Sequence, residues 1–463
     1  MRQNIFTGLL FLALLFTLTQ ISLGQAPGGQ AQKTNTEAPV ADKSDLEEKQ
    51  SAAANDLYAQ IELFSYALTT TQSEYVDVKT PQELIYGSLK GMLGSLDPHS
   101  QFLTPADYKE LKSETQGKFG GLGIEISIKD GLLTVVTPID DTPAYKVGIK
   151  AGDRIVKIED VLTKDMTLND AVKKLRGDPG TDVKVTVLRE DDFKLLDFTI
   201  KREIIQIQDV KDVMILEDKI GYVRLAEFRE ESFNEMHKAL DELRKDGMDS
   251  LIVDLRNNPG GLLNIAIKIS EDFLPPGQLI VSTKSRHKAQ DIETYSKNTQ
   301  GKVTDVPVVV LINQGSASGS EILAGALQDN KRAVILGEQS FGKGSVQSVI
   351  PLPDGSGLRL TTAKYFTPSG RSIHGKGITP DIVIERKIVK EETPEDKETA
   401  KKQKDLEAIF NNIQVKQSDN PALTQMTQKE KEAHDRLMKD NQVQAAITAI
   451  KGIRIFKKNS SST

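Results

Sequence analysis

Three polar residues in the second half of the sequence have types and a spacing that suit acyl-transfer chemistry. Ser318 lies in a Gly/Ser turn, where an apolar run gives way to apolar residues at helical spacing. Lys343 follows in a glycine-flanked loop, and Gln347 comes shortly after it. A lysine can take the proton of a serine hydroxyl only when burial or nearby positive charge lowers its pKa. Gln347 could hold a neutral lysine amine without adding a negative charge, so the pattern is typical of a Ser-Lys dyad.

A nucleotide-binding loop is a second interpretation of the same region. Residues 337–343 follow the spacing G-x-x-x-x-G-K, but Gly344 stands where a Ser or Thr would bind magnesium. The Gly-Ser-Val sequence after the lysine is also a poor start for the helix that should follow. Nucleotide binding is therefore disfavoured.

A Ser-His-Asp triad is a third interpretation. Its base must lie within hydrogen-bond reach of the serine and be oriented by a third group. Spacing selects none of the dispersed histidines His237, His287, His374 and His434, although His374, between glycine-rich turns, is the best placed.

Three serines compete for the role of nucleophile: Ser316, Ser318 and Ser320. The residues alone do not decide among them. Ser318 and Glu321 also fit the S-x-x-E pattern of a helix capping box, in which the serine begins the helix. The structural and the catalytic interpretation of Ser318 both stay open at this level.

The elements around these residues alternate between strands and helices. Apolar runs predict buried strands at 220–225, 250–255, 308–312 and 333–336. Amphipathic spacing predicts helices between them at 232–243, 262–273 and 319–328. Such a series is typical of an α/β core whose loops at the strand ends carry the site. Some antiparallel pairing is compatible with it.

From residue 117 the pattern changes to short strands, a brief helix and glycine turns. Their order and the stretch GIKAGDRI (148–155) resemble a PDZ domain. Gly120, Gly121, Leu122 and Gly123 fall where that family has its carboxylate-binding loop, and glycines there let backbone N–H groups converge on a carboxylate. The strand that begins at Ile124 offers an edge to an extended peptide.

Arg176 follows a helix expected at 167–175. Two interpretations stay open for it. Its charge complements a helix C-terminus, or it makes a regulatory contact with the catalytic domain.

The N-terminus has the features of an export signal. Arg2 precedes an apolar stretch at 5–23, and small residues flank its end, which predicts a secretory signal peptide at 1–24. An uncleaved membrane anchor is the alternative, since about 20 apolar residues span a bilayer. Either way we expect the protein in the periplasm or another extracytoplasmic space. Residues 25–55 lack periodicity and are predicted to be a disordered linker.

Composition excludes several classes of function. The net charge is −6, from 60 basic and 66 acidic residues, so no basic footprint indicates nucleic-acid binding. The chain has no cysteine, which excludes disulfides, thiolate nucleophiles and sulfur-ligated metals. We expect no metal and no cofactor. Its 463 residues suffice for about three domains.

The stretch GSASGSEILAGALQDNKRAVILGEQSFGKGSVQ (315–347) is similar to the active-site stretch of the carboxyl-terminal processing proteases, also called tail-specific proteases. The resemblance runs from about residue 57 to 385 and includes the segments LDPHS, DLRNNPGG and TPSGRSI. It implies that Ser318 attacks, that Lys343 is the base and that Gln347 orients the lysine.

The same resemblance implies that backbone N–H groups of Gly261 and Gly319 stabilise the oxyanion. The family more often has alanine where this chain has Gly319, but a backbone donor survives that change. Which glycine of the pair Gly260 and Gly261 donates stays open.

The resemblance also implies a domain order. We expect a mixed α/β protease core of the ClpP/crotonase-like type at 193–388, with an inserted PDZ domain at 115–192. Helical regions are expected at 56–114 and, highly charged, at 389–463. A terminal helix should pack on the protein itself or on a second subunit.

We therefore expect a serine endopeptidase that recognises the free C-termini of exported proteins or peptides through its PDZ domain and cleaves them through an acyl-enzyme. The resemblance leaves room for an adaptor protein and for a homo-oligomer formed through the terminal helices. A non-enzymatic PDZ adaptor is the alternative, although the intact Ser318, Lys343 and Gln347 argue against it.

Overall fold

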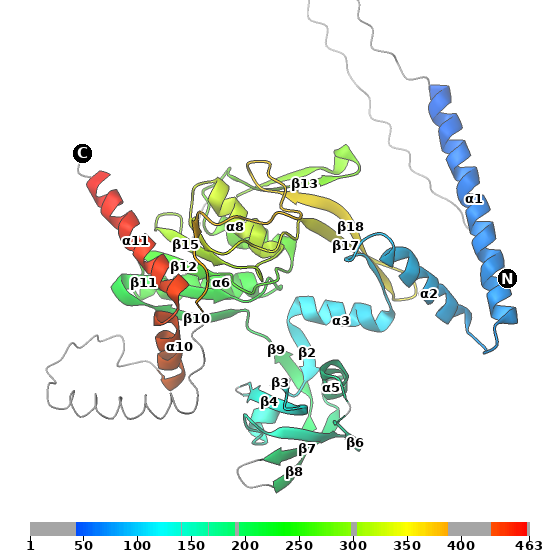
Figure 1. Cartoon of the computed structure of the whole chain (residues 1–463), viewed down its shortest axis with the longest axis horizontal. Helices are drawn as coiled ribbons and strands as arrows, with labels where there is room; N and C mark the ends of the chain where they lie inside the picture. Colours follow the sequence, from blue (N-terminus) through cyan, green and yellow to red (C-terminus); the bar gives the residue numbers. More distant parts are fainter. Residues whose placement is uncertain are drawn as a thin grey trace, which may run out of the picture. The chain divides into compact units, whose positions relative to one another are not determined.

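The computed structural model describes residues 43–139, 141–164, 166–189, 194–297, 303–387 and 427–460 (Figure 1). The chain divides into two units, residues 1–81 and 82–463. The predicted signal peptide and the predicted linker before residue 43 lie outside the described residues. No helix in the described ranges is long and apolar enough to cross a membrane.

The first unit contributes helix α1 (Lys43–Glu74). The prediction of a disordered linker is therefore wrong for residues 43–55, which are helical. This stretch is rich in Ala, Glu, Lys and Gln, which favour a helix by intrinsic propensity even without an apolar stripe. Leu57, Ile61 and Phe64, which share one face of α1, are exposed.

A six-stranded sheet forms the centre of the second unit. Its strands follow the order β10 (Val210–Ile215), β11 (Ile220–Leu225), β12 (Ser250–Asp254), β15 (Val308–Ile312), β16 (Val334–Gly337) and β19 (Ile382–Val383). The pairs from β11 to β19 are parallel, and β10 pairs antiparallel with β11. The predicted mixed α/β core is therefore confirmed.

Helices cover both faces of this sheet (Figure 1). On one face Val253 and Val310 pack in a cluster with α6 (Ser232–Lys245), α7 (Leu263–Glu271) and α8 (Gly319–Asp329). On the other face Ile252 and Val309 pack with α10 (Gln428–Met438) and α11 (Asn441–Ser460). Burial on both faces explains why the strands are continuously apolar. The expected terminal helix packs on the chain's own core.

A second, antiparallel sheet carries the segment after Lys343. It contains β1 (Gln101–Leu103), β13 (Leu279–Ser285), β14 (Ile292–Tyr295), β17 (Ser345–Pro351) and β18 (Gly357–Phe366). Helices α2 (Pro81–Gly94) and α3 (Pro105–Gln116) flank β1 in sequence. Short 3-10 turns are η1 (Glu217–Lys219) and η2 (Lys288–Gln290).

The region predicted as PDZ has its own sheet and its own apolar core. The strands are β3 (Ile124–Lys129), β4 (Leu132–Pro138), β5 (Arg154–Ile158), β6 (Val161–Leu162), β7 (Asp182–Arg189) and β8 (Lys194–Lys201). Helices α4 (Pro143–Lys146) and α5 (Leu168–Leu175) complete it. The chain enters through β2 (Lys118–Gly121) and leaves through β9 (Glu203–Gln206), which pair with each other.

Shortening a buried side chain of α11 should destabilise the core. Ile447 is 2% exposed and Ile455, on the same helix, is 63% exposed. We expect Ile447→Ala to lower the free energy of unfolding by about 2–5 kcal/mol, because a cavity forms beneath the sheet. Ile455→Ala should change it by less than about 0.5 kcal/mol. Urea unfolding of both variants measures this, and equal effects would contradict the packing of α11.

Candidate active site

Ser318 stands at a sharp turn between a buried strand and a buried helix. β15 ends at Ile312, and Ser318 is the residue that caps α8. Its backbone adopts φ 52° and ψ −109°, a conformation that costs a non-glycine residue about 1–3 kcal/mol. Such strain persists only where the surroundings enforce it. The fold therefore holds this serine in a position that its own conformational preference would not select.

The two neighbouring serines are committed to hydrogen bonds within the loop. The Ser316 hydroxyl donates to the Leu255 carbonyl oxygen at 2.8 Å, and the Ser320 hydroxyl donates to the Asn258 carbonyl oxygen at 2.9 Å. Both side chains are fully buried, whereas Ser318 keeps 7% of its surface. Of the three serines, Ser318 is therefore the one that keeps some exposed surface.

Glu321 joins the serine turn to the lysine loop. Its Oε2 accepts hydrogen bonds from the backbone N–H of Ser318 at 2.8 Å and of Lys343 at 2.9 Å. Its Oε1 accepts from the Ser340 hydroxyl and the Gly342 N–H, each at 2.6 Å. Burial raises the pKa of Glu321, while the hydrogen bonds from Ser340, Gly342, Ser318 and Lys343 oppose this shift and favour the ionised carboxylate. One buried charge thus fixes both candidate catalytic segments.

Half of the predicted capping box is present: the Ser318 N–H donates to Glu321 Oε2, whereas the Glu321 N–H donates to the Ser318 carbonyl oxygen and not to its hydroxyl. It does not compete with a catalytic role of Ser318. The cap fixes the backbone of the serine, and the same carboxylate extends to the lysine loop. Glu321 is the residue whose second role sequence reasoning missed, because the S-x-x-E pattern signals only its contact with the helix start.

Lys343 occupies a tight loop. A Cβ on Gly344 would lie 2.2 Å from the backbone nitrogen of His374, so only glycine permits this approach of the two backbones. The lysine side chain is half-buried. Burial, and secondarily the positive charge of Arg359, lower the pKa of Lys343, while the Glu321 carboxylate opposes the shift. The environment therefore shifts the amine toward the neutral form that a general base requires.

Gln347 lies on β17, next to an irregularity in the pairing with β18. Its amide nitrogen donates to Ser345 Oγ at 2.9 Å and to Thr361 Oγ1 at 3.4 Å. Among the described residues no hydrogen bond joins this amide to Lys343 Nζ, and none joins Lys343 Nζ to Ser318 Oγ. The structure brings the three segments together, but not in hydrogen-bond contact.

The loop with the two glycines packs directly against the serine turn. A Cβ on Gly260 would lie 2.7 Å from the Ser318 Cβ. The Gly260 N–H donates to Asn258 Oδ1 at 2.8 Å, and its carbonyl accepts from the Phe228 N–H at 2.8 Å. Within the described ranges the Gly261 N–H has no such partner. The donor of Gly260 is thus occupied and that of Gly261 is available.

Gly319 is the first residue of α8. The first N–H groups of a helix have no partner within it, so this donor points out of the helix end. A Cβ on Gly319 would lie 3.1 Å from the Phe228 ring. Glycine at this position lets that ring pack closely behind the turn.

The two rival chemistries find no support in this geometry. A strand, β17, follows Lys343, whereas a phosphate loop requires a helix there. His374 is exposed, and His237 contacts Asp272 through Nδ1 at 3.2 Å. No hydrogen bond among the described residues joins a histidine to the Ser318 hydroxyl. No group of three His, Cys, Asp or Glu within the described part of the chain is arranged to hold a metal ion.

The predicted carboxylate loop divides into two parts. Gly120 and Gly121 belong to strand β2, and a Cβ on Gly120 would lie 2.0 Å from the Gly177 carbonyl oxygen, so close packing requires this glycine. The N–H groups of Leu122 and Gly123 donate to no other described residue. They precede Ile124, which starts the edge strand β3.

Arg176 contacts helix α3, which precedes the PDZ sheet in the sequence. The last carbonyl groups of α5 accept from Arg202, at 2.8 Å and 3.0 Å, so Arg176 is not needed to complement that helix end. The Arg176 guanidinium lies 3.6 Å from Glu110 Oε1 on α3 and 4.4 Å from the centre of the Phe119 ring. It also lines a cavity of about 230 Å³ together with Arg229.

The chain matches known proteins in both regions. Residues 219–384 match peptidase family S41, and residues 134–189 match the PDZ domain. It is 46% identical to a carboxy-terminal-processing protease of Bartonella bacilliformis, over 72% of this chain and 76% of that protein. The chain belongs to the carboxy-terminal-processing proteases of peptidase family S41. It is therefore a serine peptidase with a PDZ domain.

Other members of this family are similar over most of the chain. A carboxyl-terminal-processing protease of Synechocystis is 39% identical over 67% of this chain and 74% of that protein. Carboxy-terminal processing protease CtpA of Bacillus subtilis is 36% identical over 73% of this chain and 71% of that protein. A solved photosystem II D1 C-terminal processing protease is 32% identical, covers 69% of this chain and 86% of its own, and superposes with a TM-score of 0.43.

Removal of one oxygen of the Glu321 carboxylate should disorder both segments. In Glu321→Gln an amide NH₂ faces two buried donors, and each donor left unpaired costs about 1–3 kcal/mol. We expect a fall of at least about 2 kcal/mol in the free energy of unfolding and of about 100-fold in kcat. Urea unfolding and peptidase assays measure the two effects. Glu230→Gln changes an exposed carboxylate and serves as control; a Glu321→Gln enzyme as active as this control would contradict the assignment.

Proposed function

We propose that this peptidase cleaves exported proteins through a Ser-Lys acyl-enzyme mechanism, after recognition of their C-termini by the PDZ domain. The observation that carries the proposal is the Glu321 carboxylate, which holds the backbone of Ser318 and of Lys343 on one oxygen. The backbones of the proposed nucleophile and of the proposed base are thus hydrogen-bonded to the same buried carboxylate. The lowered pKa of Lys343 supports its role as the base.

The reaction begins when the neutral Lys343 amine takes the proton of the Ser318 hydroxyl. The oxygen attacks the peptide carbonyl, and the N–H groups of Gly261 and Gly319 donate to the oxyanion that forms. The lysine then returns its proton to the leaving amine, and water hydrolyses the acyl-enzyme with the lysine again as base. Side-chain rotation must bring the amine to the hydroxyl, and Gln347 then holds the amine. Catalytic hydrogen bonds often tighten only when substrate binds.

Substrate recognition is assigned to the PDZ edge. The unpartnered N–H groups of Leu122 and Gly123 fit a C-terminal carboxylate, and the edge strand β3 fits an extended peptide. Gly120 and Gly121 support this loop from β2. Arg176 directly follows α5 and pairs with Glu110 of α3. Through this ion pair, peptide binding at the PDZ domain would change the position of α3 and thereby affect the protease core.

The cellular setting is part of the proposal. The signal peptide implied by residues 1–24 would deliver the enzyme to the periplasm or another extracytoplasmic space. The exposed apolar face of α1 fits a homo-oligomer that forms through terminal helices. An adaptor protein that presents substrates is compatible with the same arrangement.

Removal of either dyad residue should abolish cleavage and leave the fold intact. Ser318→Ala and Lys343→Ala remove the nucleophile and the base, so kcat on an unstructured peptide with a free C-terminal carboxylate should fall at least about 10⁴-fold. The melting temperature should stay near that of the wild type. Ser95→Ala removes an exposed serine hydroxyl, serves as the control and should retain most activity. Cleavage by Ser318→Ala at the wild-type rate would refute the mechanism.

The pH dependence of the rate should report the Lys343 amine. Because the charge of Arg359 lowers the pKa of Lys343, Arg359→Gln should raise that pKa. Activity requires the neutral amine, so the acid limb of kcat/KM should move to higher pH in this variant. Arg359→Lys keeps the charge, loses the same contact with the His99 carbonyl, and should leave the limb in place. Equal profiles for both variants would contradict the role of the charge.

A further inference from the structure

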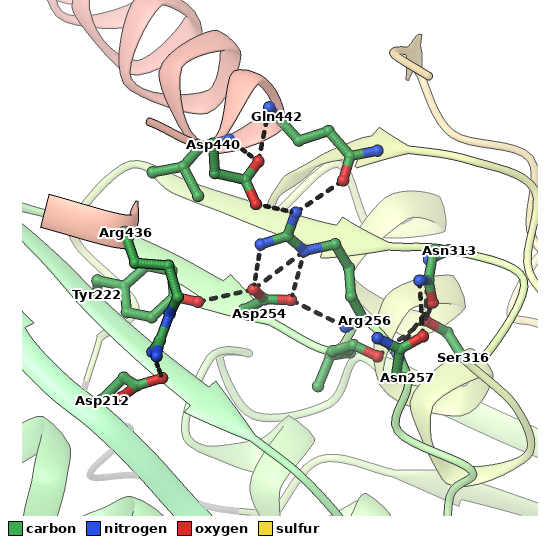
Figure 2. Close-up of polar contacts among 12 residues, drawn as sticks. Asp212, Tyr222, Asp254, Arg256, Asn257, Asn313, Ser316, Arg436, Asp440 and Gln442 are labelled. Atoms are coloured by element: carbon green, nitrogen blue, oxygen red, sulfur yellow. Dashed lines mark hydrogen bonds and ion pairs between the residues drawn. The ribbon is translucent and has the colours of Figure 1, made fainter. Parts of the chain in front are cut away.

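A buried arginine, directly before the loop that contains Gly260 and Gly261, connects the end of β12 to the start of the C-terminal helix (Figure 2). Arg256 directly precedes the segment 257–261, and its side chain is 8% exposed. Nε and Nη2 donate to the Asp254 carboxylate, at 3.0 Å and 2.6 Å. Nη1 donates to Asp440 Oδ2 at 2.8 Å and to Gln442 Oε1 at 2.7 Å. The guanidinium therefore bridges the end of β12 and the start of α11.

Each partner of this arginine is fixed in turn. The Tyr222 hydroxyl donates to Asp254 Oδ2 at 2.7 Å. Asp440 Oδ1 accepts from the backbone N–H of Gln442 at 2.9 Å and of Val443 at 3.3 Å, so the same carboxylate caps α11. The Gln442 amide donates to the Ile384 carbonyl at 2.7 Å. Because its three partners are held in place, the Arg256 guanidinium is restricted to one position.

The loop after Arg256 reaches the serine turn within a few residues. The Asn257 N–H donates to Asn313 Oδ1 at 2.8 Å, and Asn257 itself has φ 58°. The Asn258 carbonyl accepts from the Ala317 N–H at 3.0 Å, directly before Ser318. A displacement of Arg256 would therefore be transmitted to the positions of the glycine N–H groups and of the nucleophile.

From this geometry we propose that Asp440 and Gln442 of the C-terminal helix act, through Arg256, as positioning residues for the oxyanion loop. The C-terminal segment is thus part of the catalytic apparatus, although the peptidase match ends at residue 384. The inference rests on the proposed function, because it assumes that the Gly261 N–H binds the oxyanion. The C-terminal segment stabilises the transition state by positioning the oxyanion donors, and it does not contribute to the binding of the substrate's C-terminus.

Asp440→Asn separates these roles. Asparagine caps a helix as well as aspartate does, so α11 keeps its start. The charged acceptor for Arg256 Nη1 is lost, and misplaced oxyanion donors should lower kcat about 10- to 100-fold. KM should stay unchanged. The affinity for an unstructured peptide with a free C-terminal carboxylate, measured by fluorescence anisotropy in a Ser318→Ala background, should also stay unchanged. Amide exchange should accelerate in residues 256–261.

The control is Asp212→Asn. Asp212 also pairs with an arginine of the C-terminal helices, Arg436, at 3.0 Å (Figure 2). No hydrogen bond or ion pair among the described residues joins Asp212 to residues 257–261. This variant should keep the wild-type kcat. Asp440→Ser also caps α11 and replaces Asp440→Asn if that variant does not fold. In Arg256→Lys, which cannot bridge both carboxylates, adding Asp440→Asn should cause no further loss.

Three results would overturn the inference: an unchanged kcat in Asp440→Asn, a loss equal to that of Asp212→Asn, or a change confined to KM. An inactive Ser318→Ala beside a fully active Asp440→Asn rejects the positioning role and leaves the proposed mechanism standing. A Ser318→Ala enzyme that still cleaves the peptide rejects the mechanism itself.

Discussion

The site depends on one buried carboxylate. Glu321 is fully buried and accepts four hydrogen bonds, from Ser318, Ser340, Gly342 and Lys343. No basic side chain is among these partners, so four hydrogen-bond donors compensate the buried carboxylate. The strained backbone of Ser318 and the tight loop of Lys343 would both relax without this anchor. Glu321 lies on the first turn of α8, and α8 packs in the core against the sheet, so the carboxylate is held in a fixed place.

The sequence predicted what depends on local pattern. The apolar runs of β12 and β15, the helix that follows Ser318 and the inserted PDZ region all have signals within a short window. The prediction of a linker at 25–55 was wrong from Lys43, because helix propensity without an apolar stripe leaves no periodicity to detect. Glu321 was visible only as a cap, since its contacts with the lysine loop arise from the parallel arrangement of β15 and β16.

Contacts between distant segments were beyond a single sequence. Asp440 follows Arg256 by almost two hundred residues, and neither residue type nor spacing links them. The link exists because β12 is buried on both faces, which makes α11 necessary as a cover and places its first residues over the strand's end. The same reasoning applies to Arg202, which takes the place at the end of α5 that Arg176 could have filled.

The central claim is that Glu321 holds the serine turn and the lysine loop as one unit. Amide hydrogen exchange of the folded enzyme tests it most directly, in peptides that cover residues 316–320 and 341–345. If the claim is right, exchange in both segments is slow in the wild type and accelerates together in Glu321→Gln, while the PDZ sheet is unaffected. Acceleration of one segment alone, or of neither, would contradict it.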